Sequence, residues 1–262
     1  VFNTFIKKKQ LSDEVINKNI DELISQGTDV IVASMAFGVD SMEEEQKIHD
    51  LASKKNIPVT MASDITKLYG LTRRTRTAAI NASILPKMMA TANATESSVR
   101  GAGVSVPLMI MRGDGGVMEI NEMRKRPILT ALSGPAASVM GSLMYLRASN
   151  AIYFEVGGTT TNIGVIKNGR PGVDYAKIGG HDTYINSLDV RILGCAGGSM
   201  VRISDKDVID VGPRSAHIAG CEYACFTPEE EIVNPQIELV SPKKGDPADY
   251  CVIKLQNGKK IC

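Results

Sequence analysis

The sequence has almost no net charge, no long hydrophobic run and no regular cysteine pattern, and each absence excludes a class of function. Thirty Lys and Arg residues against 29 Asp and Glu residues leave a formal charge of +1, which gives no broad field for attracting nucleic acid or an anionic membrane. No apolar run approaches the roughly 20 residues of a membrane-spanning helix, and the first residues carry no secretory pattern. We therefore expect no nucleic-acid partner, no membrane association, and the cytoplasm as the default location.

The cysteines do not indicate a disulfide framework. There are five in 262 residues, an odd count at irregular spacing: Cys195, Cys221, Cys225, Cys251 and Cys262. A chain of this length with 43% hydrophobic residues buries a substantial core in one large domain or two smaller ones without covalent help. We expect reduced thiols. Val1 is not an initiator residue, and residues 251–262 resemble a strand, a turn and the start of a return strand, so we also expect a fragment of a longer polypeptide.

The first part of the sequence predicts a small parallel α/β segment. Residues 12–26 place apolar side chains on one helical face, and residues 29–35 form a short, almost continuously apolar run typical of a strand covered on both faces. Ser41 and Glu44 then have the spacing of a capping box, and residues 57–61 supply a second strand. The order helix, strand, helix, strand indicates parallel pairing.

The next segment predicts a long helix and a change of domain. Residues 71–94 are rich in Ala, Thr, Met and Leu without glycine, which favours a mostly buried helix that is interrupted or kinked near Pro86. We place a domain boundary just before it. Residues 105–111 are strand-like and lead into a turn at residues 113–116, and residues 133–141 carry the small residues of a closely packed helix.

The most informative segment is residues 151–167, which predicts two strands joined by a tight turn of five small residues: Gly157, Gly158, Thr159, Thr160 and Thr161. Backbone N–H groups at glycines can approach phosphate oxygens closely, and threonine hydroxyls add donors. Glu155 at the strand end can hold a hydrated divalent cation beside the phosphates. The alternative is a hairpin whose glycines merely permit the turn.

Further strands and a second glycine-rich loop follow this turn. An Asn-Gly pair at residues 168–169 is a strong hairpin signal, and the residues from 173 onward continue as a strand, so three consecutive antiparallel strands are expected. Residues 188–193 predict another strand, which ends in the glycine-rich loop 194–200.

Several motifs together resemble the hydantoinase A and oxoprolinase family. They occur in the family's order between about residues 12 and 226, and besides the central segment they are Arg74-Thr-Arg-Thr77, Asn81-Ala82, Ser133-Gly-Pro-Ala-Ala137, Ala196-Gly-Gly-Ser199 and Gly212-Pro-Arg-Ser-Ala216. The resemblance implies an α/β protein with an actin-like ATPase domain, that is, a ribonuclease-H-like domain with a mixed sheet. By that resemblance, residues 1–69 form the end of an N-terminal hydantoinase/oxoprolinase domain, and residues 70–262 form a hydantoinase A domain truncated at its C-terminus.

The same resemblance implies an ATP site with Mg²⁺. The glycine-threonine turn would hold phosphate, Glu155 would hold Mg²⁺ through water, and Gly197, Gly198 and Ser199 would contact the nucleoside, with Ser199 capping a helix that follows. The sequence departs from the family pattern at two positions beside the turn: the family usually has aspartate where this chain has Glu155 and Asn162. The earlier phosphate loop of such folds has no counterpart before Ala151, so we expect negligible ATPase activity from this chain in isolation.

The function implied by the resemblance is ATP-dependent phosphorylation of an amide or enol oxygen, followed by ring-opening hydrolysis or by carboxylation. The substrate would be a cyclic amide or a related small molecule, and a B-type subunit is a possible partner. Two alternatives stay open: a non-hydrolytic or chaperone-like nucleotide-dependent regulator, which Asn162 favours, and a small-molecule kinase.

Other polar residues give weaker signals. Asp114 lies between glycines, where its carboxylate can activate water or accept a proton, although it serves equally well as a turn residue.

Three further groups have plain structural explanations beside their functional ones. His181 and Asp182 can act as metal ligands or as a base and its orienter, or as a polar loop pair. The spacing of His217, Cys221 and Cys225 can supply three zinc ligands, or two small packing residues beside a histidine. Arg73, Arg74 and Arg76 form a basic cluster. It could bind a phosphate or a carboxylate, or it could simply be the solvated start of a helix.

Overall fold

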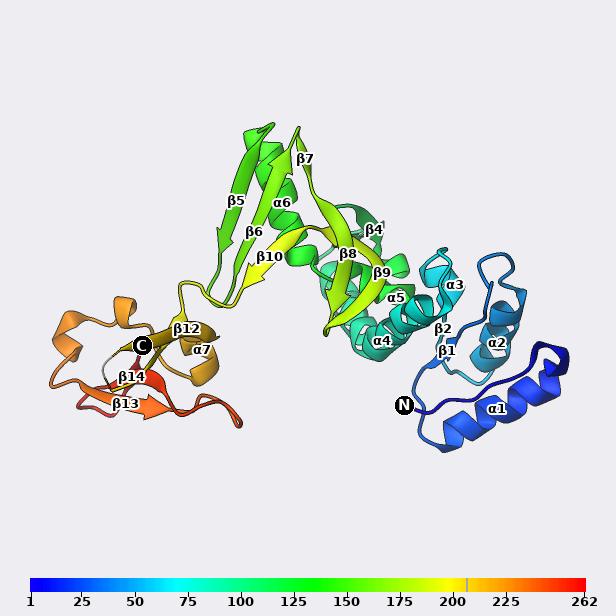
Figure 1. Ribbon diagram of the computed structural model, residues 1–262, viewed down its shortest axis with the longest axis horizontal. Coiled ribbons are helices and arrows are strands. Elements are labelled where there is room, and N and C mark those ends of the chain that lie inside the picture. Colours follow the sequence, from blue (N-terminus) through cyan, green and yellow to red (C-terminus); the bar gives the residue numbers. More distant parts are fainter. Residues whose placement is uncertain (206) are drawn as a thin grey trace. The chain divides into compact units, whose positions relative to one another are not determined.

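The computed structural model describes residues 1–205 and 207–262. The chain forms two compact units (Figure 1), the first from residues 1–140 and 173–188 and the second from residues 141–172 and 189–262. Both combine helices with β-strands, as the α/β prediction requires. The predicted division into residues 1–69 and 70–262 concerns family domains and stays a prediction.

The first unit opens with the predicted helix–strand–helix–strand order. Its elements are η1 (Lys8–Gln10), α1 (Asp13–Ser25), β1 (Ile31–Ala33), α2 (Glu43–Ser53), β2 (Val59–Met61) and α3 (Ala62–Ile65). Strands β1 and β2 pair in parallel, with Ile31 opposite Val59, which confirms the predicted parallel pairing. The predicted capping box is wrong: α2 has Met42 at its N-cap position, and the Ser41 hydroxyl accepts only a 3.4 Å bond from the Glu43 N–H.

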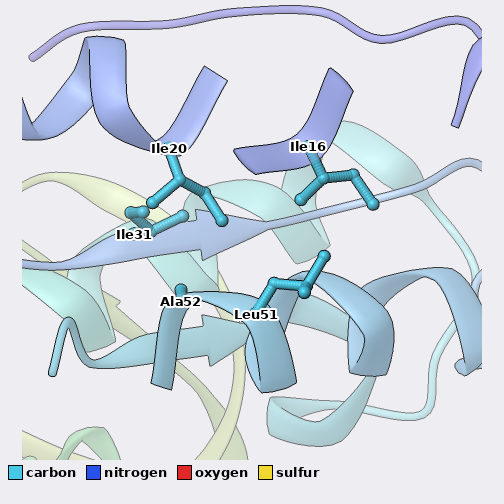
Figure 2. Packing of buried hydrophobic residues seen from close by; sticks show 5 residues of the cluster. All are labelled: Ile16, Ile20, Ile31, Leu51 and Ala52. Carbon is cyan, nitrogen blue, oxygen red and sulfur yellow. The ribbon is translucent and has the colours of Figure 1, made fainter. Parts of the chain in front are cut away.

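The core of this segment lies between α1, β1 and α2. Ile16 and Ile20 are one helical turn apart on α1, so they share the face that meets Ile31 on β1 and the pair Leu51 and Ala52 on α2 (Figure 2). The Ser12 hydroxyl accepts a 3.3 Å bond from the N–H of Val15 and caps α1. The polar first turn and the apolar stripe of α1 therefore both follow from the sequence pattern.

Helix α4 (Leu71–Gly101) is longer and less buried than predicted. It continues without interruption through Pro86, although proline offers no N–H to the carbonyl of Ala82 one turn earlier. Its buried residues form a stripe at helical spacing over its first half, followed by one further buried residue: Arg74, Thr77, Ala78, Asn81, Ala82, Leu85 and Ala92. The glycine-free composition correctly predicted the helix, whereas most of its surface faces solvent.

The rest of the first unit packs two hairpins and short helices around α4. The elements are β3 (Met109–Met111), β4 (Val117–Glu119), α5 (Ile120–Lys125), η2 (Pro127–Thr130), β8 (Val173–Ile178) and β9 (His181–Leu188), and α6 (Ser133–Leu146) crosses the boundary between the units. Strands β3 and β4 form one antiparallel pair and β8 and β9 another. The predicted turn and the predicted helix at residue 133 are both confirmed.

The second unit begins with the predicted hairpin. Strands β5 (Ala151–Val156) and β6 (Thr161–Lys167) pair antiparallel, and β10 (Val190–Leu193) pairs antiparallel with the other edge of β6. The expected third strand of a meander is reduced to the two residues of β7 (Arg170–Pro171). The residues from Val173 onward pair with β9 in the first unit instead, so this part of the prediction was wrong.

A second sheet completes this unit in the order β12-β11-β14-β13, with β15 beside β14. Its elements are β11 (Ser199–Ile203), β12 (Val208–Ser215), α7 (Ala216–Ala219), η3 (Ala224–Phe226), η4 (Glu229–Glu231), β13 (Gln236–Val240), β14 (Tyr250–Lys254) and β15 (Lys260–Ile261). Its core contains Met200, Tyr250 and Val252. The hairpin predicted near the end of the sequence is confirmed as β14 and β15. Across residues 1–205 and 207–262, no helix is both long and apolar enough to cross a membrane.

Candidate nucleotide-phosphate site

The turn between β5 and β6 is closed by a single backbone bond, in which the Gly157 N–H donates to Thr160 O at 3.0 Å. Neither Gly157 nor Gly158 has a φ in the left-handed region. An added methyl group at Gly158 would lie 3.8 Å from its nearest neighbour, an ordinary contact distance. Backbone conformation and internal packing therefore do not account for glycine at position 158, whereas a carbon added to Gly157 would lie only 3.3 Å from Thr160 O, so the turn itself favours glycine at 157.

The second glycine-rich loop lies directly against this turn. The Gly197 N–H donates to Gly157 O at 3.1 Å, and the Gly198 N–H donates to Gly158 O at 2.9 Å. An added methyl group at Gly198 would lie 2.7 Å from Gly158 O, closer than a real carbon approaches an oxygen. Glycine is therefore required at 198 for the two loops to meet, and the structure brings together both predicted nucleotide-binding elements.

These bonds leave a row of donors at the tip of the turn. Among the described residues, the N–H groups of Gly158, Thr159 and Thr160 donate to no backbone or side-chain acceptor. Consecutive free N–H groups in a turn can bind an anion. Gly158 is exposed, whereas Thr159 and Thr160 are half-buried, so solvent reaches the tip of the turn.

The three threonine hydroxyls have different roles. Thr161 donates its hydroxyl to Cys195 O at 2.6 Å and so ties the turn to the start of the second loop. The Thr159 hydroxyl donates to the Ser215 hydroxyl at 3.4 Å. For the Thr160 hydroxyl, no partner occurs within the described part of the chain. Of the three predicted phosphate donors, Thr160 is thus the one whose hydroxyl stays available.

The role predicted for Ser199 as a helix cap is wrong. No helix follows it, because Ser199 is the first residue of strand β11. Its hydroxyl accepts a 2.8 Å bond from the Ala196 N–H and its own N–H donates to Ala196 O at 3.0 Å. Ser199 therefore closes the glycine loop on itself. The glycine-serine spacing is compatible with a helix cap and with a loop closure, and the sequence alone does not separate them.

Glu155 lies on β5 opposite Asn162 on β6. The Asn162 side-chain amide donates to Glu155 Oε2 at 2.8 Å, so asparagine here orients the carboxylate. Asn162 is 7% exposed, and its Oδ1 is buried with no hydrogen-bond partner in the described residues. A buried carbonyl oxygen without a donor costs roughly 1–3 kcal/mol. The pair therefore holds an unused acceptor beside the predicted metal-binding carboxylate.

Tyr153 extends this polar row along the same face of β5. Its ring lies against Gly164, where any side chain would collide with it, and its hydroxyl is buried and finds no partner among the described residues. Burial, together with the nearby carboxylates of Glu155 and Asp189, raises the pKa of Tyr153 to about 12. The phenol is therefore protonated at neutral pH.

Asp114 belongs to the first unit and Glu155 to the second. The Asp114 carboxylate accepts a bond from the Gly116 N–H at 3.0 Å and pairs with Arg112 across the β3–β4 turn. These contacts are those of a turn residue. A catalytic role for Asp114 stays a prediction without geometric support.

The arginines at the start of α4 serve the structure of the first unit. Arg74 is 1% exposed and donates to the carbonyls of Leu68 and Met35. Arg73 lies between the rings of Tyr175 and Tyr184, with its guanidinium carbon 4.5 Å from each centroid.

The histidine candidates do not form sites. His181 and Asp182 are exposed at the start of β9, where Asp182 pairs with Lys177 at 3.5 Å. Within residues 1–205 and 207–262, no group of three or more His, Cys, Asp or Glu side chains is placed to hold a metal ion. The zinc site suggested by the spacing of His217, Cys221 and Cys225 is therefore not formed.

Sequence reasoning missed one residue at the junction of the loops. An added methyl group at Gly198 would lie 2.7 Å from Tyr223 Oη, and one at Gly158 would lie 3.8 Å from the same atom. Tyr223 is a lone aromatic residue outside both glycine loops, and no motif or spacing in the sequence indicated it.

The comparison with protein families decides the assignment. The model of the hydantoinase/oxoprolinase family matches residues 74–232, which is more than half of the sequence and includes both glycine loops. The chain belongs to the hydantoinase/oxoprolinase family. The resemblance stated from the motifs is confirmed.

Relatives in this family are distant and much longer. The caprolactamase subunit alpha of Pseudomonas jessenii is 25% identical over 214 residues, which cover 79% of this chain and 30% of that protein. The acetophenone carboxylase gamma subunit of Aromatoleum aromaticum is 23% identical over 226 residues, again 79% of this chain and 30% of that protein. The chain thus spans about a third of the length of the relatives it matches.

Solved structures establish the fold. The ATP-dependent caprolactamase from Pseudomonas jessenii has a TM-score of 0.64 at 21% identity, covering 82% of this chain and 32% of that chain. A nucleotide-free acetone carboxylase structure, from a study of ATP-dependent acetone carboxylation, has a TM-score of 0.63 at 21% identity and covers 78% of this chain and 30% of that chain. The predicted α/β ATPase-type fold is confirmed.

Proposed function

We propose that this chain supplies a phosphate-binding element of an ATP-dependent enzyme that phosphorylates an amide or enol oxygen, before ring-opening hydrolysis or carboxylation. One observation carries the proposal: two glycine loops are hydrogen-bonded to each other, and the N–H groups of residues 158–160 find no acceptor in residues 1–205 and 207–262. Backbone donors at a solvent-open turn match the many acceptor oxygens of a polyphosphate.

The residues also suit Mg²⁺ in the way that nucleotide enzymes use it. Magnesium keeps several water ligands and is held by one or two carboxylates together with substrate phosphates. Glu155 is one such carboxylate, and the Asn162 amide fixes its Oε2. In this role the pair would orient a hydrated ion, and the ion would neutralise phosphate charge.

The chemistry proposed for the whole protein follows its relatives. Their names describe an ATP-dependent caprolactamase and ATP-dependent acetone carboxylation, reactions in which a poor electrophile or leaving group must be activated. A cyclic amide or a ketone-like molecule is therefore the substrate class we propose. Two relatives are named as subunits, alpha and gamma, which supports a B-type partner subunit. These relatives favour the enzyme over a non-hydrolytic regulator.

Calorimetric titration with ATP, with and without Mg²⁺, tests the site itself. We expect binding that Mg²⁺ strengthens and that Gly158→Val abolishes, because a branched side chain would fill the tip of the turn. Gly134→Ala is the control, because open space surrounds the added carbon. Gly169→Val is less suitable, because Gly169 has a φ of 71° and a side chain there would strain the backbone. A wild-type chain that binds no ATP would contradict the proposal.

Turnover distinguishes the reaction classes. Phosphate release would be measured with cyclic amides and with ketones plus bicarbonate, in the presence of a B-type subunit. Amide-dependent release supports a hydrolase, and ketone-dependent release supports a carboxylase. A stable phosphorylated product would instead indicate a kinase, and tight ATP binding without turnover under any of these conditions would indicate a regulator. We expect negligible hydrolysis by the 262-residue chain alone.

A further inference from the structure

We propose that the Tyr223 hydroxyl is an additional donor to the phosphate held at the turn of residues 158–160. The inference rests on the proposed function and extends it to a residue that lies outside both glycine loops. It assigns to Tyr223 a binding role toward the polyphosphate part of the nucleotide, through a single O–H group.

Geometry places the ring at the junction of the loops. A carbon added to Gly198 would lie 2.7 Å from Tyr223 Cε1 and 2.7 Å from its Oη, so the hydroxyl end of the ring lies against the buried Gly198 backbone. The same Oη is 3.8 Å from a carbon added to Gly158. Since Gly158 is the first residue of the free N–H row, the hydroxyl lies at the edge of the proposed anion site.

The ring is fixed by its surroundings. Phe226 meets it edge-on, with centroids 5.9 Å apart. The backbone around it is held by two bonds, from the Thr227 hydroxyl to Tyr223 O at 3.1 Å and from the Ala224 N–H to Cys262 O at 2.9 Å. A donor that is already fixed loses little conformational freedom when it binds a ligand, which favours affinity.

The hydroxyl has no partner of its own in the described part of the chain. Two other tyrosine hydroxyls are used internally: Tyr250 donates to Gly212 O at 3.4 Å, and Tyr69 donates to Asp40. Tyr223 is half-buried, and its hydroxyl is free to donate to a ligand. A phosphate oxygen at residues 158–160 would provide the acceptor that the chain does not.

Titrations with tripolyphosphate, ATP and adenosine test the inference. Tyr223→Phe removes only the hydroxyl and keeps the ring packing, so thermal unfolding of the variant should match that of the wild-type chain. We expect affinities for tripolyphosphate and ATP to fall about tenfold, the equivalent of ~1.4 kcal/mol, with adenosine binding unchanged. Tyr145→Phe removes an 89% exposed tyrosine hydroxyl from α6 and should change none of the three affinities.

The outcomes separate the inference from the proposed function. Wild-type binding that Tyr223→Phe leaves unchanged overturns the inference alone, as does a loss confined to adenosine. A wild-type chain that binds neither tripolyphosphate nor ATP overturns the proposed function and the inference with it. A selective loss with the two polyphosphates supports both.

Discussion

Two buried asparagines show the difference between a polar side chain whose hydrogen-bonding groups are all used by the fold and one whose carbonyl oxygen is not. Asn81 on α4 is fully buried, and its amide donates to Thr60 Oγ1 at 3.1 Å and to Lys125 O at 3.2 Å. Its Oδ1 accepts a 3.1 Å bond from the Ile128 N–H. Asn162 on β6 is nearly as buried, yet it makes one bond to Glu155 and leaves Oδ1 without a donor.

The difference has a consequence for locating function. Buried polar groups in folded proteins are almost always hydrogen-bonded, so an exception needs an explanation. Asn81 connects α4, β2 and η2, and removing it would damage the fold of the first unit. Asn162 and the N–H groups of residues 158–160 lie within a few residues of one another on the β5–β6 hairpin. Buried polar atoms without a partner also occur in the described part of the first unit, on Glu44, Arg74, Arg112 and Arg126, so it is the row of free backbone N–H groups that favours this hairpin as the place where a ligand binds.

The largest effect expected from this comparison is on stability. Asn81→Ala would remove three hydrogen bonds and leave the N–H of Ile128 buried without an acceptor, so we expect a loss of about 2–4 kcal/mol in the free energy of unfolding. Urea denaturation followed by circular dichroism measures it. Asn121→Ala, on an exposed turn of α5, should cost less than about 1 kcal/mol. If Asn81→Ala lowered the free energy of unfolding no more than Asn121→Ala does, the contrast between Asn81 and Asn162 would be wrong.

The next effect concerns the contact between the two glycine loops. Gly198→Ala would place a carbon 2.7 Å from Gly158 O and force the loops apart. We expect ATP affinity to fall at least about tenfold and the free energy of unfolding to fall by about 1–3 kcal/mol, as for other overpacked sites. The neighbouring change Gly197→Ala is a matched control for stability, because its added carbon would lie 3.5 Å from Gly157 O, an ordinary contact. Equal losses in the free energy of unfolding at both positions would show that the close approach at 198 is unimportant.

The sequence predicted most of the local structure around the site. The five small residues between two strand-like runs in residues 151–167 predicted the hairpin, and the family resemblance assigned the glycine-rich motifs to one site before their contact was known. That contact was not predictable from spacing, because it depends on bonds such as Gly198 N–H to Gly158 O across 40 residues of sequence. The family resemblance supplied the connection instead.

The failures have physical causes. Ser199 closes a loop onto Ala196 because a β-strand follows it, and a serine after glycines signals either outcome. Tyr223 was overlooked because a lone aromatic side chain carries no periodic signal, and its place beside Gly198 arises only when η3 folds. The prediction of a third meander strand was wrong because the residues after Gly172 form β8 and pair with β9. In each case a tertiary contact decided between locally equivalent choices.

A smaller effect tests the orientation of Glu155 by Asn162. Asn162→Asp would replace the amide donor with a carboxylate facing Glu155, and two such carboxylates raise the pKa of one of them. We expect a loss of about 1 kcal/mol at pH 7 without divalent cations, reduced by millimolar Mg²⁺ and by lowering the pH until one carboxyl is protonated. Thermal unfolding with and without Mg²⁺ measures it. The thermal unfolding of Asn186→Asp, at an exposed position of β9, should not depend on Mg²⁺. If the unfolding of Asn162→Asp did not depend on Mg²⁺ either, this would argue against a cation beside Glu155.

The smallest expected effect is at Tyr153. Its buried hydroxyl, like Oδ1 of Asn162, has no hydrogen-bond partner among the described residues. Removing an unpartnered hydroxyl forfeits no hydrogen bond, so Tyr153→Phe should change the free energy of unfolding at pH 7 by no more than about 0.5 kcal/mol. The pKa of Tyr153 is raised to about 12 in the folded chain, against about 10 in an unfolded chain. Because the folded state resists deprotonation, the wild-type chain should lose stability relative to Tyr153→Phe as the pH rises from about 10 through 12.

Urea denaturation measures the stability of both chains over that range. If the two curves of stability against pH ran parallel, the Tyr153 hydroxyl would be solvated. If Tyr153→Phe were clearly less stable than the wild-type chain at pH 7, the hydroxyl would have a partner. Either result would remove Tyr153 from the polar atoms of the β5–β6 hairpin that lack a partner among the described residues, and would leave Asn162 alone in the contrast with Asn81.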